Sequence, residues 1–152
     1  MPQRSRTTLL LAFAAIAALA SAAGGSSATA RLRPDLVEAS LSNPPPRVAA
    51  GGSFQLTDVV KNRGRATARR STTVYTLTGG EVRVAVASRA VPRLRPGKRS
   101  TATTKVTIPS STQNGTYTIV VCADAMRAVA ESNERNNCRT SAQFLVRRAP
   151  LP

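Results

Sequence analysis

Hydrophobic and polar positions alternate along most of the chain beyond residue 34. In residues 101–109, Val106 and Ile108 share one face with Ala102 and Thr104, while the positions between them are Thr or Lys. This period of two is typical of a half-buried β-strand, whose successive side chains point to opposite faces. Together with turn signals between apolar runs, it predicts strands at residues 35–41, 51–62, 71–80, 81–91, 101–109, 113–125 and 136–146.

The turns between these segments favour antiparallel neighbours. Gly79-Gly80 joins two apolar runs as a hairpin signal, and Asn114-Gly115 begins another strand. About seven short strands with frequent turn signals are the sequence signature of a two-sheet sandwich. We therefore expect an all-β, seven-stranded antiparallel sandwich.

One acidic residue falls on a predicted core face. Asp58 is in phase with Phe54, Leu56 and Val60. A buried aspartate must be paired or protonated. We expect Asp58 to meet an arginine or backbone amides at a sheet edge or bulge, and we prefer this interpretation to a catalytic role because no partner acid or base is evident.

The last two predicted strands are out of phase with each other. The core face of residues 117–123 excludes Cys122, whereas Cys138 is in phase with the core positions of residues 142–146. A β-bulge reverses the phase of one strand relative to its neighbour. We therefore predict a bulge between Cys138 and Ala142.

The first thirty residues have the composition of a targeting segment. Arg4 and Arg6 precede an uncharged apolar run at residues 9–19, and small residues follow. This arrangement is typical of a secretory signal peptide, and the run is shorter than the roughly 20 residues that span a bilayer. An uncleaved membrane anchor is the alternative.

These features predict the domain organisation. Residues 1–23 form the signal peptide, 24–33 a flexible linker, 34–148 the sandwich and 149–152 a tail. Cleavage fits after Ala20, Ala23 or Ala30, and the sequence does not choose among them. The processed protein is expected to lack an integral membrane span and to be secreted, extracellular or periplasmic, where disulfides persist.

Two cysteines enclose a segment rich in Asp, Glu and Asn. An even number of cysteines in a secreted chain favours a disulfide, here Cys122 to Cys138, which stabilises by about 3 kcal/mol for a loop of this length. We interpret the segment as a stapled hairpin with a tight turn at Asn133-Glu134. Some of its polar side chains should bond their own loop backbone: Asp124, Asn133, Asn136 and Asn137.

A calcium site is the competing interpretation of this segment. Asp124, Glu131 and Glu134 offer the hard oxygen ligands that Ca²⁺ prefers, but the regular D-x-D-x-D-G spacing is missing. We therefore favour a hairpin without a cofactor.

The composition limits catalysis. The chain has no His, which excludes Ser-His and Cys-His pairs and the usual zinc triads, and its two cysteines are expected to be bonded. We expect no catalytic residues, and an uncharacterised hydrolase is the distant alternative.

The chain is strongly basic, with 22 Lys and Arg against 7 Asp and Glu and a net charge of +15. Such a field attracts polyanions. A bias in the base composition of the coding DNA explains the excess of Arg and Ala equally well, so charge alone does not establish a binding site.

Basic residues cluster in two predicted loops. Loop residues on a rigid sandwich often bind ligands, and the planar fork of Arg suits phosphate and carboxylate. The interleaved aromatic residues of a nucleic-acid stacking platform are missing, so nucleic acid is not the expected partner. Solvated surface charge is the simpler interpretation; the candidate polyanion-binding residues are Arg63, Arg65, Arg69, Arg70, Arg93, Arg95, Lys98 and Arg99.

Several short motifs in residues 34–146 resemble the CARDB family, the cell adhesion related domain found in bacteria. They are V-x-N-x-G (Val60, Asn62, Gly64), Pro96-Gly97, Asn114 with G-x-Y (Gly115, Tyr117), and V-x-E-x-x-E-x-N-N (Val129, Glu131, Glu134, Asn136, Asn137). The resemblance implies an immunoglobulin-like or fibronectin-III-like sandwich on secreted or surface proteins, usually as one module among several. It makes Asn62, Gly64, Asn114, Gly115, Tyr117, Asn136 and Asn137 structural residues.

Two partners remain open. A cell-envelope polyanion would be bound through the arginine-rich loops. Another surface protein would instead bind strand edges or the 122–138 hairpin, as for an accessory or inhibitor module. The ligand and the oligomeric state are not determined by the sequence.

Overall fold

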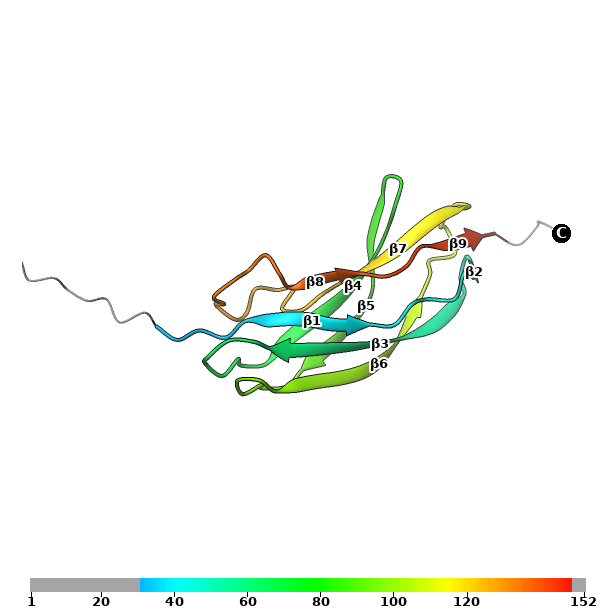
Figure 1. The fold of residues 1–152 in the computed structure, drawn as a ribbon. Coiled ribbons are helices and arrows are strands. Elements are labelled where there is room, and N and C mark those ends of the chain that lie inside the picture. The colour runs from blue at the N-terminus through cyan, green and yellow to red at the C-terminus, as the bar shows by residue number, and fades with distance from the viewer. Residues whose placement is uncertain (1–30, 149–152) are drawn as a thin grey trace, which may run out of the picture. The chain divides into compact units, whose positions relative to one another are not determined.

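Two β-sheets pack face to face in the computed structural model, which describes residues 31–148 (Figure 1). The expected signal peptide, most of the linker and the C-terminal tail lie outside the described residues. The strands are β1 (Leu36–Leu41), β2 (Arg47–Ala49), β3 (Ser53–Asn62), β4 (Ser71–Gly79), β5 (Val82–Val91), β6 (Arg99–Thr107), β7 (Gly115–Cys122), β8 (Cys138–Thr140) and β9 (Phe144–Arg147).

The strands confirm the predicted all-β sandwich and correct its details. One sheet has the order β1-β3-β6, and the other has the order β2-β9-β7-β4-β5, with β8 pairing β7. The predicted seven strands are nine in the described part of the chain, because β2 is too short to show a period and the last predicted strand is divided into β8 and β9. The sandwich is not wholly antiparallel, since β2 runs parallel to β9. Residues 31–148 contain no helix that could span a membrane.

Alternate residues of both sheets form the core between them. β3 and β6 contribute Phe54, Leu56 and Val106, and they face Tyr75, Leu77, Tyr117, Ile119 and Phe144 of the larger sheet. The rings of Phe54 and Phe144 meet edge to face with centroids 5.7 Å apart. A second apolar cluster includes Leu36, Val60, Ala68, Leu94 and Val129 and lies under the loops at one end.

The predicted bulge is confirmed. Val120 pairs with Thr140 whereas Tyr117 pairs with Phe144, so residues 141–143 lie opposite only two residues of β7. Ser141 fills the irregularity, because its Oγ accepts the backbone N–H of Ile119 at 2.9 Å. The extra residue restores the phase, which allows Cys138 to lie opposite Cys122 while Phe144 enters the core.

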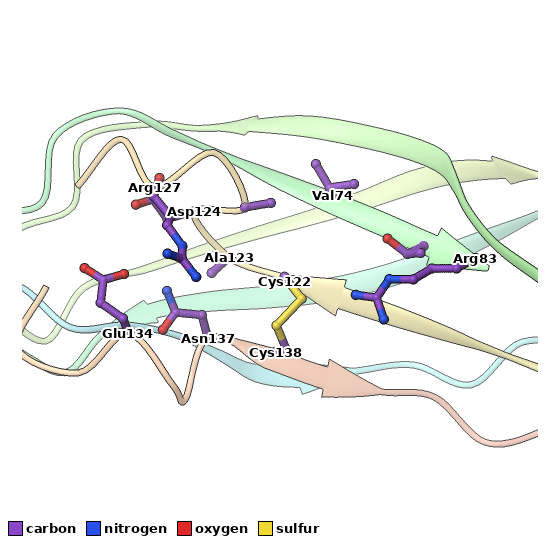
Figure 2. Close-up of a pocket in the computed structure, with 11 residues that line it drawn as sticks. Val74, Arg83, Cys122, Ala123, Asp124, Arg127, Glu134, Asn137 and Cys138 are labelled. Atoms are coloured by element: carbon purple, nitrogen blue, oxygen red, sulfur yellow. A yellow bond between two sulfur atoms is a disulfide. The ribbon is translucent and has the colours of Figure 1, made fainter. Parts of the chain in front are cut away.

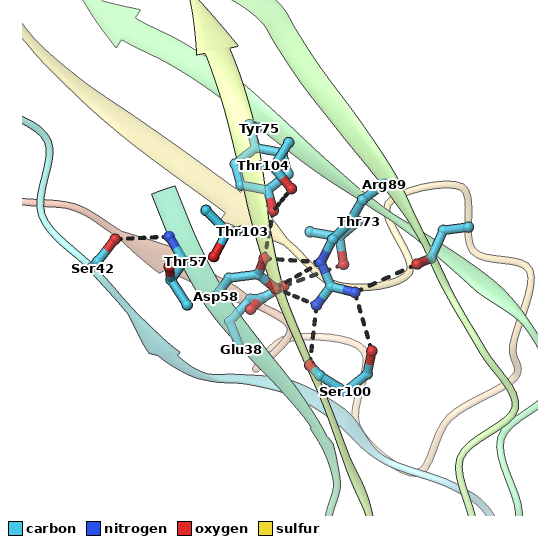
Figure 3. A network of polar contacts seen from close by, with 11 residues as sticks. Glu38, Ser42, Thr57, Asp58, Thr73, Tyr75, Arg89, Ser100, Thr103 and Thr104 are labelled. Carbon is cyan, nitrogen blue, oxygen red and sulfur yellow. Dashed lines mark hydrogen bonds and ion pairs between the residues drawn. The ribbon is translucent and has the colours of Figure 1, made fainter. Parts of the chain in front are cut away.

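The two sheets are joined by a buried ion pair (Figure 3). Asp58 on β3 accepts hydrogen bonds from the guanidinium of Arg89 on β5, with Nε at 2.9 Å from one carboxylate oxygen. The hydroxyl of Tyr75 donates to the same carboxylate, and Arg89 also donates to the carbonyl of Ser100 at 3.2 Å. The predicted arginine partner is therefore confirmed, but its place is not a sheet edge: Asp58 lies on the central strand of its sheet, and Arg89 reaches it from the other sheet.

A second buried carboxyl lies in this network. Glu38 on β1 is only 4% exposed and lies beside Asp58. One of its oxygens accepts a hydrogen bond from Thr73 Oγ1 at 3.4 Å, and the other has no partner. Burial, and then the negative charge of Asp58, raises the pKa of Glu38 from 4.5 to about 8. Sequence reasoning did not identify Glu38, because its burial depends on contact with Asp58, which lies 20 positions further along the chain.

The disulfide is confirmed. Cys122 and Cys138 are bonded, and the two residues lie directly opposite each other at the end of β7 and the start of β8. Both flank the loop of residues 123–137, so the bond closes that loop covalently at the point where the strands separate.

Stability is predicted to decrease as pH rises. Glu38 keeps its proton in the folded protein up to about pH 8, whereas the unfolded chain loses it near pH 4.5. The free energy of unfolding should therefore fall between these pH values. Glu38→Gln should flatten this slope and exceed the wild type at pH 9 by at least about 1 kcal/mol. Urea unfolding from pH 5 to 9 measures it, with the exposed Glu81→Gln as the control; equal slopes in wild type and Glu38→Gln would contradict it.

Removing the disulfide should destabilise the protein markedly. The double variant Cys122→Ala/Cys138→Ala should lose about 3 kcal/mol in the free energy of unfolding, because its unfolded chain is no longer constrained. Chemical denaturation under oxidising conditions measures the loss. Reductant should destabilise the wild type to a similar extent and leave the double variant unchanged; a double variant as stable as the oxidised wild type would refute the expectation.

Candidate functional site

One buried side chain connects three segments at the end of the sandwich. Asn62, the last residue of β3, is fully buried. Its Nδ2 donates to the carbonyls of Ala66 at 2.8 Å and Leu94 at 3.0 Å. Its Oδ1 accepts from the backbone N–H groups of Asp35 at 3.1 Å and Gly64 at 3.0 Å. Asn62 thereby holds the entry to β1, the β3–β4 loop and the β5–β6 loop together.

The glycine of the V-x-N-x-G motif allows this close packing. A Cβ at position 64 would lie 2.4 Å from the carbonyl oxygen of Arg33 and from the carbonyl carbon of Pro34. Only glycine permits the backbone of the loop to approach residues 33–35 so closely. The motif therefore fixes how the β3–β4 loop lies against the entry to β1.

The two arginine-rich loops lie at the same end of the domain. Ala68 and Leu94 form a reciprocal backbone bridge, with N–O distances of 2.9 and 3.0 Å. In Figure 1 both loops lie at the left end of the sandwich, whereas β2 and β9 lie at the right. All eight predicted candidates are exposed: Arg63, Arg65, Arg69, Arg70, Arg93, Arg95, Lys98 and Arg99. We refer to them as the basic end.

One residue of the basic end, Arg69, forms hydrogen bonds within the protein. The guanidinium of Arg69 donates to the carbonyl of Ala128, with Nε at 2.7 Å. This contact fixes the loop of residues 123–137 against the β3–β4 loop. Arg69 is therefore primarily a structural contact, which sequence reasoning did not distinguish from its neighbours.

Most of the acidic residues are buried. Four of the seven are buried: Glu38, Asp58, Asp124 and Glu131. Within residues 31–148 the only salt bridge is that of Asp58 with Arg89. Few surface carboxylates therefore oppose the field of the exposed cations, and the positive charge is concentrated outside the core.

The disulfide closes the 122–138 segment, and two of the four side chains expected to bond the loop backbone do so. The carboxylate of Asp124 accepts the N–H groups of Ala128 at 3.0 Å and Val129 at 2.8 Å. Asn133 Oδ1 accepts the N–H of Arg135 at 3.0 Å at the turn. These contacts order the loop by the hydrogen bonds that Asp and Asn side chains typically make in turns.

The two adjacent asparagines differ from this expectation. Asn136 donates to the carboxylate of Asp35 at 3.0 Å, and Asn137 donates to Glu131 at 2.9 Å. They bond other side chains rather than the loop backbone, because the loop lies against the entry to β1. Their structural role in the closing motif is thus to join the loop to the N-terminal strand.

Glu131 anchors the loop to β1. Its carboxylate accepts the backbone N–H of Leu36 as well as the amide of Asn137. Desolvation by burial raises the pKa of Glu131 to about 7, although the hydrogen bond from Leu36 opposes the change. The carboxyl of Glu131 thus acts as the hydrogen-bond acceptor for the N–H of Leu36, the first residue of β1, in the place where a neighbouring strand would offer a carbonyl.

The three proposed calcium ligands are separately engaged. Asp124 and Glu131 bind the backbone groups described above, and Glu134 accepts the N–H of Glu131 at 2.9 Å. Among residues 31–148, no three acidic, Cys or His side chains gather around one point that could hold a metal ion. Each of the three carboxylates accepts a backbone N–H group and so helps to order the loop or its contact with β1.

The G-x-Y motif orders the opposite end of the sandwich. The hydroxyl of Tyr117 donates to the carbonyl of Gln113 at 3.1 Å, four residues upstream, and Asn114 Oδ1 accepts the N–H of Arg148 at 2.7 Å. The ring of Tyr117 lies 3.3 Å from where a Cβ of Gly115 would be. This arrangement is similar to the tyrosine corner of immunoglobulin-like sandwiches, in which a Tyr hydroxyl bonds the backbone shortly before its strand.

Comparisons with known proteins agree with this architecture. The CARDB family model matches residues 33–141. A CARDB domain from Pyrococcus furiosus, solved in complex with di-metal ions, is 25% identical, with a TM-score of 0.56 over 75% of this chain and 94% of that one. A domain of a putative cell surface protein from Methanosarcina acetivorans is 24% identical, with a TM-score of 0.54 over 75% of this chain and 92% of that one.

A third likeness concerns the fold alone. β-Glucosidase 3B from Thermotoga neapolitana is 12% identical, with a TM-score of 0.53, and the match covers 74% of this chain but only 16% of the enzyme. No curated protein matches the chain.

The family model covers the motifs that build the end of the domain, since both lie within residues 33–141. The residues of the V-x-N-x-G and closing V-x-E-x-x-E-x-N-N motifs form the hydrogen bonds between β1, β3 and the stapled loop. CARDB domains are non-enzymatic, adhesion-related modules of the cell-surface type. The chain belongs to the CARDB family.

Proposed function

We propose that this protein is a secreted or cell-surface binding module that attaches to anionic polymers of the cell envelope through its basic end. The observation that carries the proposal is the placement of the two arginine-rich loops. Strand pairing and Asn62 bring residues 63–70 and 93–99 together, although about 30 positions of sequence separate them. Seven of their eight basic side chains have no hydrogen bond to another residue in the part of the chain that the structure describes.

The electrostatics support an extended anionic ligand. Planar guanidinium groups bind carboxylate and phosphate through two donors at once, and several such groups on one rigid end attract a polyanion more strongly than scattered charges do. The rigid support comes from the disulfide, the loop caps and the second apolar cluster beneath the loops. Burial of the acidic residues leaves this field largely uncompensated.

A protein partner is the second candidate, and one observation favours it. β5 is the outer strand of the larger sheet, and next to it lies an apolar depression of about 360 Å³ that includes Val74, Ala85 and Ala87. Met126, on the rim, is 70% exposed. An open edge beside exposed apolar side chains suits the addition of a strand from another protein.

Removing charge from the basic end should weaken polymer binding strongly. The variant Arg63→Gln/Arg65→Gln/Lys98→Gln keeps every hydrogen bond described above, so it should fold normally. Its cosedimentation with cell envelopes at low salt should fall at least about tenfold. Wild-type binding should weaken steeply as salt is raised.

A matched variant controls for net charge. Arg47→Gln/Arg147→Gln/Arg148→Gln removes the same charge from the opposite end, near β2 and β9. It should retain most of the binding. Equal losses in the two variants would refute a localised site, and binding that persists at high salt would point to the protein partner instead.

We further propose that attachment needs no metal ion, because the loop carboxylates are occupied by backbone N–H groups. Addition of Ca²⁺ should therefore leave the melting temperature of the protein unchanged, and EDTA should leave envelope binding unchanged. A rise in melting temperature that saturates with Ca²⁺ would contradict this, since a ligand that binds only the folded state stabilises it.

A further inference from the structure

The outer face of the smaller sheet, on β3 and β6, carries hydroxyl groups and cations but no carboxylate. The only acidic residue of these two strands, Asp58, is buried on the other face. We refer to this outer surface as the β3–β6 face. Its side chains alternate with the core positions and lie in five directly opposed pairs: Ser53 with Thr107, Gln55 with Lys105, Thr57 with Thr103, Val59 with Thr101 and Lys61 with Arg99.

The opposed side chains of this face lie close together. The backbone N–H of Asn62 donates to the carbonyl of Lys98 at 3.0 Å, so hydrogen-bonded pairs occur there and at every second residue along the two strands. The pairs of the β3–β6 face are therefore the non-hydrogen-bonded ones, whose side chains approach more closely. The hydroxyls of Thr57 and Thr103, bonded to each other at 2.8 Å, agree with this geometry.

One of these pairs places like charges opposite each other. Lys61 lies opposite Arg99 where β3 ends and β6 begins. Like charges directly opposite on neighbouring strands destabilise a sheet. The only salt bridge within residues 31–148 is that of Asp58 with Arg89, so no carboxylate of the described chain pairs with these two cations. An anion bound against the pair would relieve this repulsion.

A second cationic position lies further along the same face. Lys105 is exposed and opposes Gln55, six positions before Lys61 on β3. At about 3.4 Å per residue, the two cationic positions are about 20 Å apart. Between them the face carries no charge and includes the hydroxyl pair of Thr57 and Thr103. An extended chain can therefore place anionic groups at both positions and lie over neutral side chains between them.

The β3–β6 face continues directly from the basic end. Arg99 belongs to both surfaces, and Lys98 and Arg63 are its neighbours at the ends of the two strands. In Figure 1, β3 and β6 lie side by side and extend away from the basic end. The outer face of the larger sheet differs, because a depression on it is lined by both Arg83 and Glu134 (Figure 2). A polyanion that extends beyond the basic end therefore meets uniformly favourable charge only on the smaller sheet.

We propose that the β3–β6 face binds an extended polyanion whose chain runs along the two strands from the basic end, an inference that rests on the proposed function. Anionic groups lie against Lys61 with Arg99 and against Lys105. The pair of Thr57 and Thr103 uses one hydroxyl proton in its mutual bond and donates the other to the polymer. A neutral polysaccharide gains nothing from the cations, and a second copy of this basic chain is repelled by them.

Polyphosphates of two lengths test the inference by calorimetry with the disulfide-bonded protein. Tripolyphosphate is shorter than the spacing of the two cationic positions, whereas long-chain polyphosphate exceeds it. Lys105→Gln should weaken binding of the long chain at least about threefold at low salt. It should also lower the slope of log affinity against log salt by about 1, as expected for the loss of one phosphate contact. Binding of tripolyphosphate at the basic end should not change.

Two variants control for charge. Lys105→Arg keeps the cation and should bind the long chain as the wild type does. Arg83→Gln removes the same charge from an exposed position on the larger sheet, and it should change neither the affinity nor its salt dependence. Since Lys105 and Arg83 are exposed and form no salt bridge among the described residues, the melting temperatures of these variants should match the wild type.

A further variant tests the like-charge pair. Lys61→Gln removes the repulsion with Arg99, so its melting temperature should equal or exceed that of the wild type. Its affinity for long-chain polyphosphate should nevertheless fall, as for Lys105→Gln. A lower melting temperature would overturn the argument from like charges, because Lys61 would then be a structural residue.

The outcomes distinguish this inference from the proposed function. If Lys105→Gln and Arg83→Gln weaken binding of the long chain equally, or neither does, the β3–β6 face is refuted while polyanion binding by the basic end stands. If the free protein sediments as a dimer that Lys105→Gln dissociates, the face contacts a second copy of the chain instead. If the wild type binds neither polyphosphate, the proposed function fails as well, because electrostatic attraction of this kind does not depend on the chemistry of the polymer.

Discussion

The architecture of the basic end depends on the four hydrogen bonds of Asn62. The side chain is fully buried at the end of β3 and satisfies both of its amide donors and two acceptor positions with backbone groups of other segments. Replacement by any other residue would leave several of these backbone groups unpaired in a dry environment. One polar residue therefore determines how the entry to β1 and two basic loops are arranged, although the apolar core supplies most of the stability.

In this sandwich most acidic side chains are buried, whereas most basic side chains are exposed. Inside, Asp58 and Arg89 join the two sheets, with Glu38 beside them and Tyr75 and Ser100 as further partners. Near the loops, Asp124 and Glu131 replace missing backbone partners. Because the acidic groups serve these internal roles, the surface is left with a large excess of arginine. The positive field is thus partly a consequence of how the domain satisfies its own backbone.

The stapled loop is held by several parts of the domain. The disulfide closes it at one side, and Arg69 and Glu131 hold it against neighbouring segments. Such fixation limits the entropy that would be lost on binding, which is the general advantage of a pre-organised site. The loop expected to be a stapled hairpin is therefore also a fixed part of the domain that presents Arg127 at its surface.

The sequence by itself determined the fold class, the strand positions, the disulfide and the bulge before Ala142, because each of these follows from local periodicity or from the count of cysteines. It also identified Asp58 as a buried carboxylate that would meet either an arginine or backbone amides. It did not reveal β2, whose three residues are too few to show a period, nor which arginine meets Asp58.

Only the tertiary structure decided which polar residues meet. The pairing of Asp58 with Arg89, the position of Glu38 and the anchoring of Arg69 all join residues from separate strands or loops. Periodicity reports the face on which a side chain lies, but not the residue that the opposite sheet places before it. That choice depends on register and on the packing of the two sheets, which are properties of the whole chain.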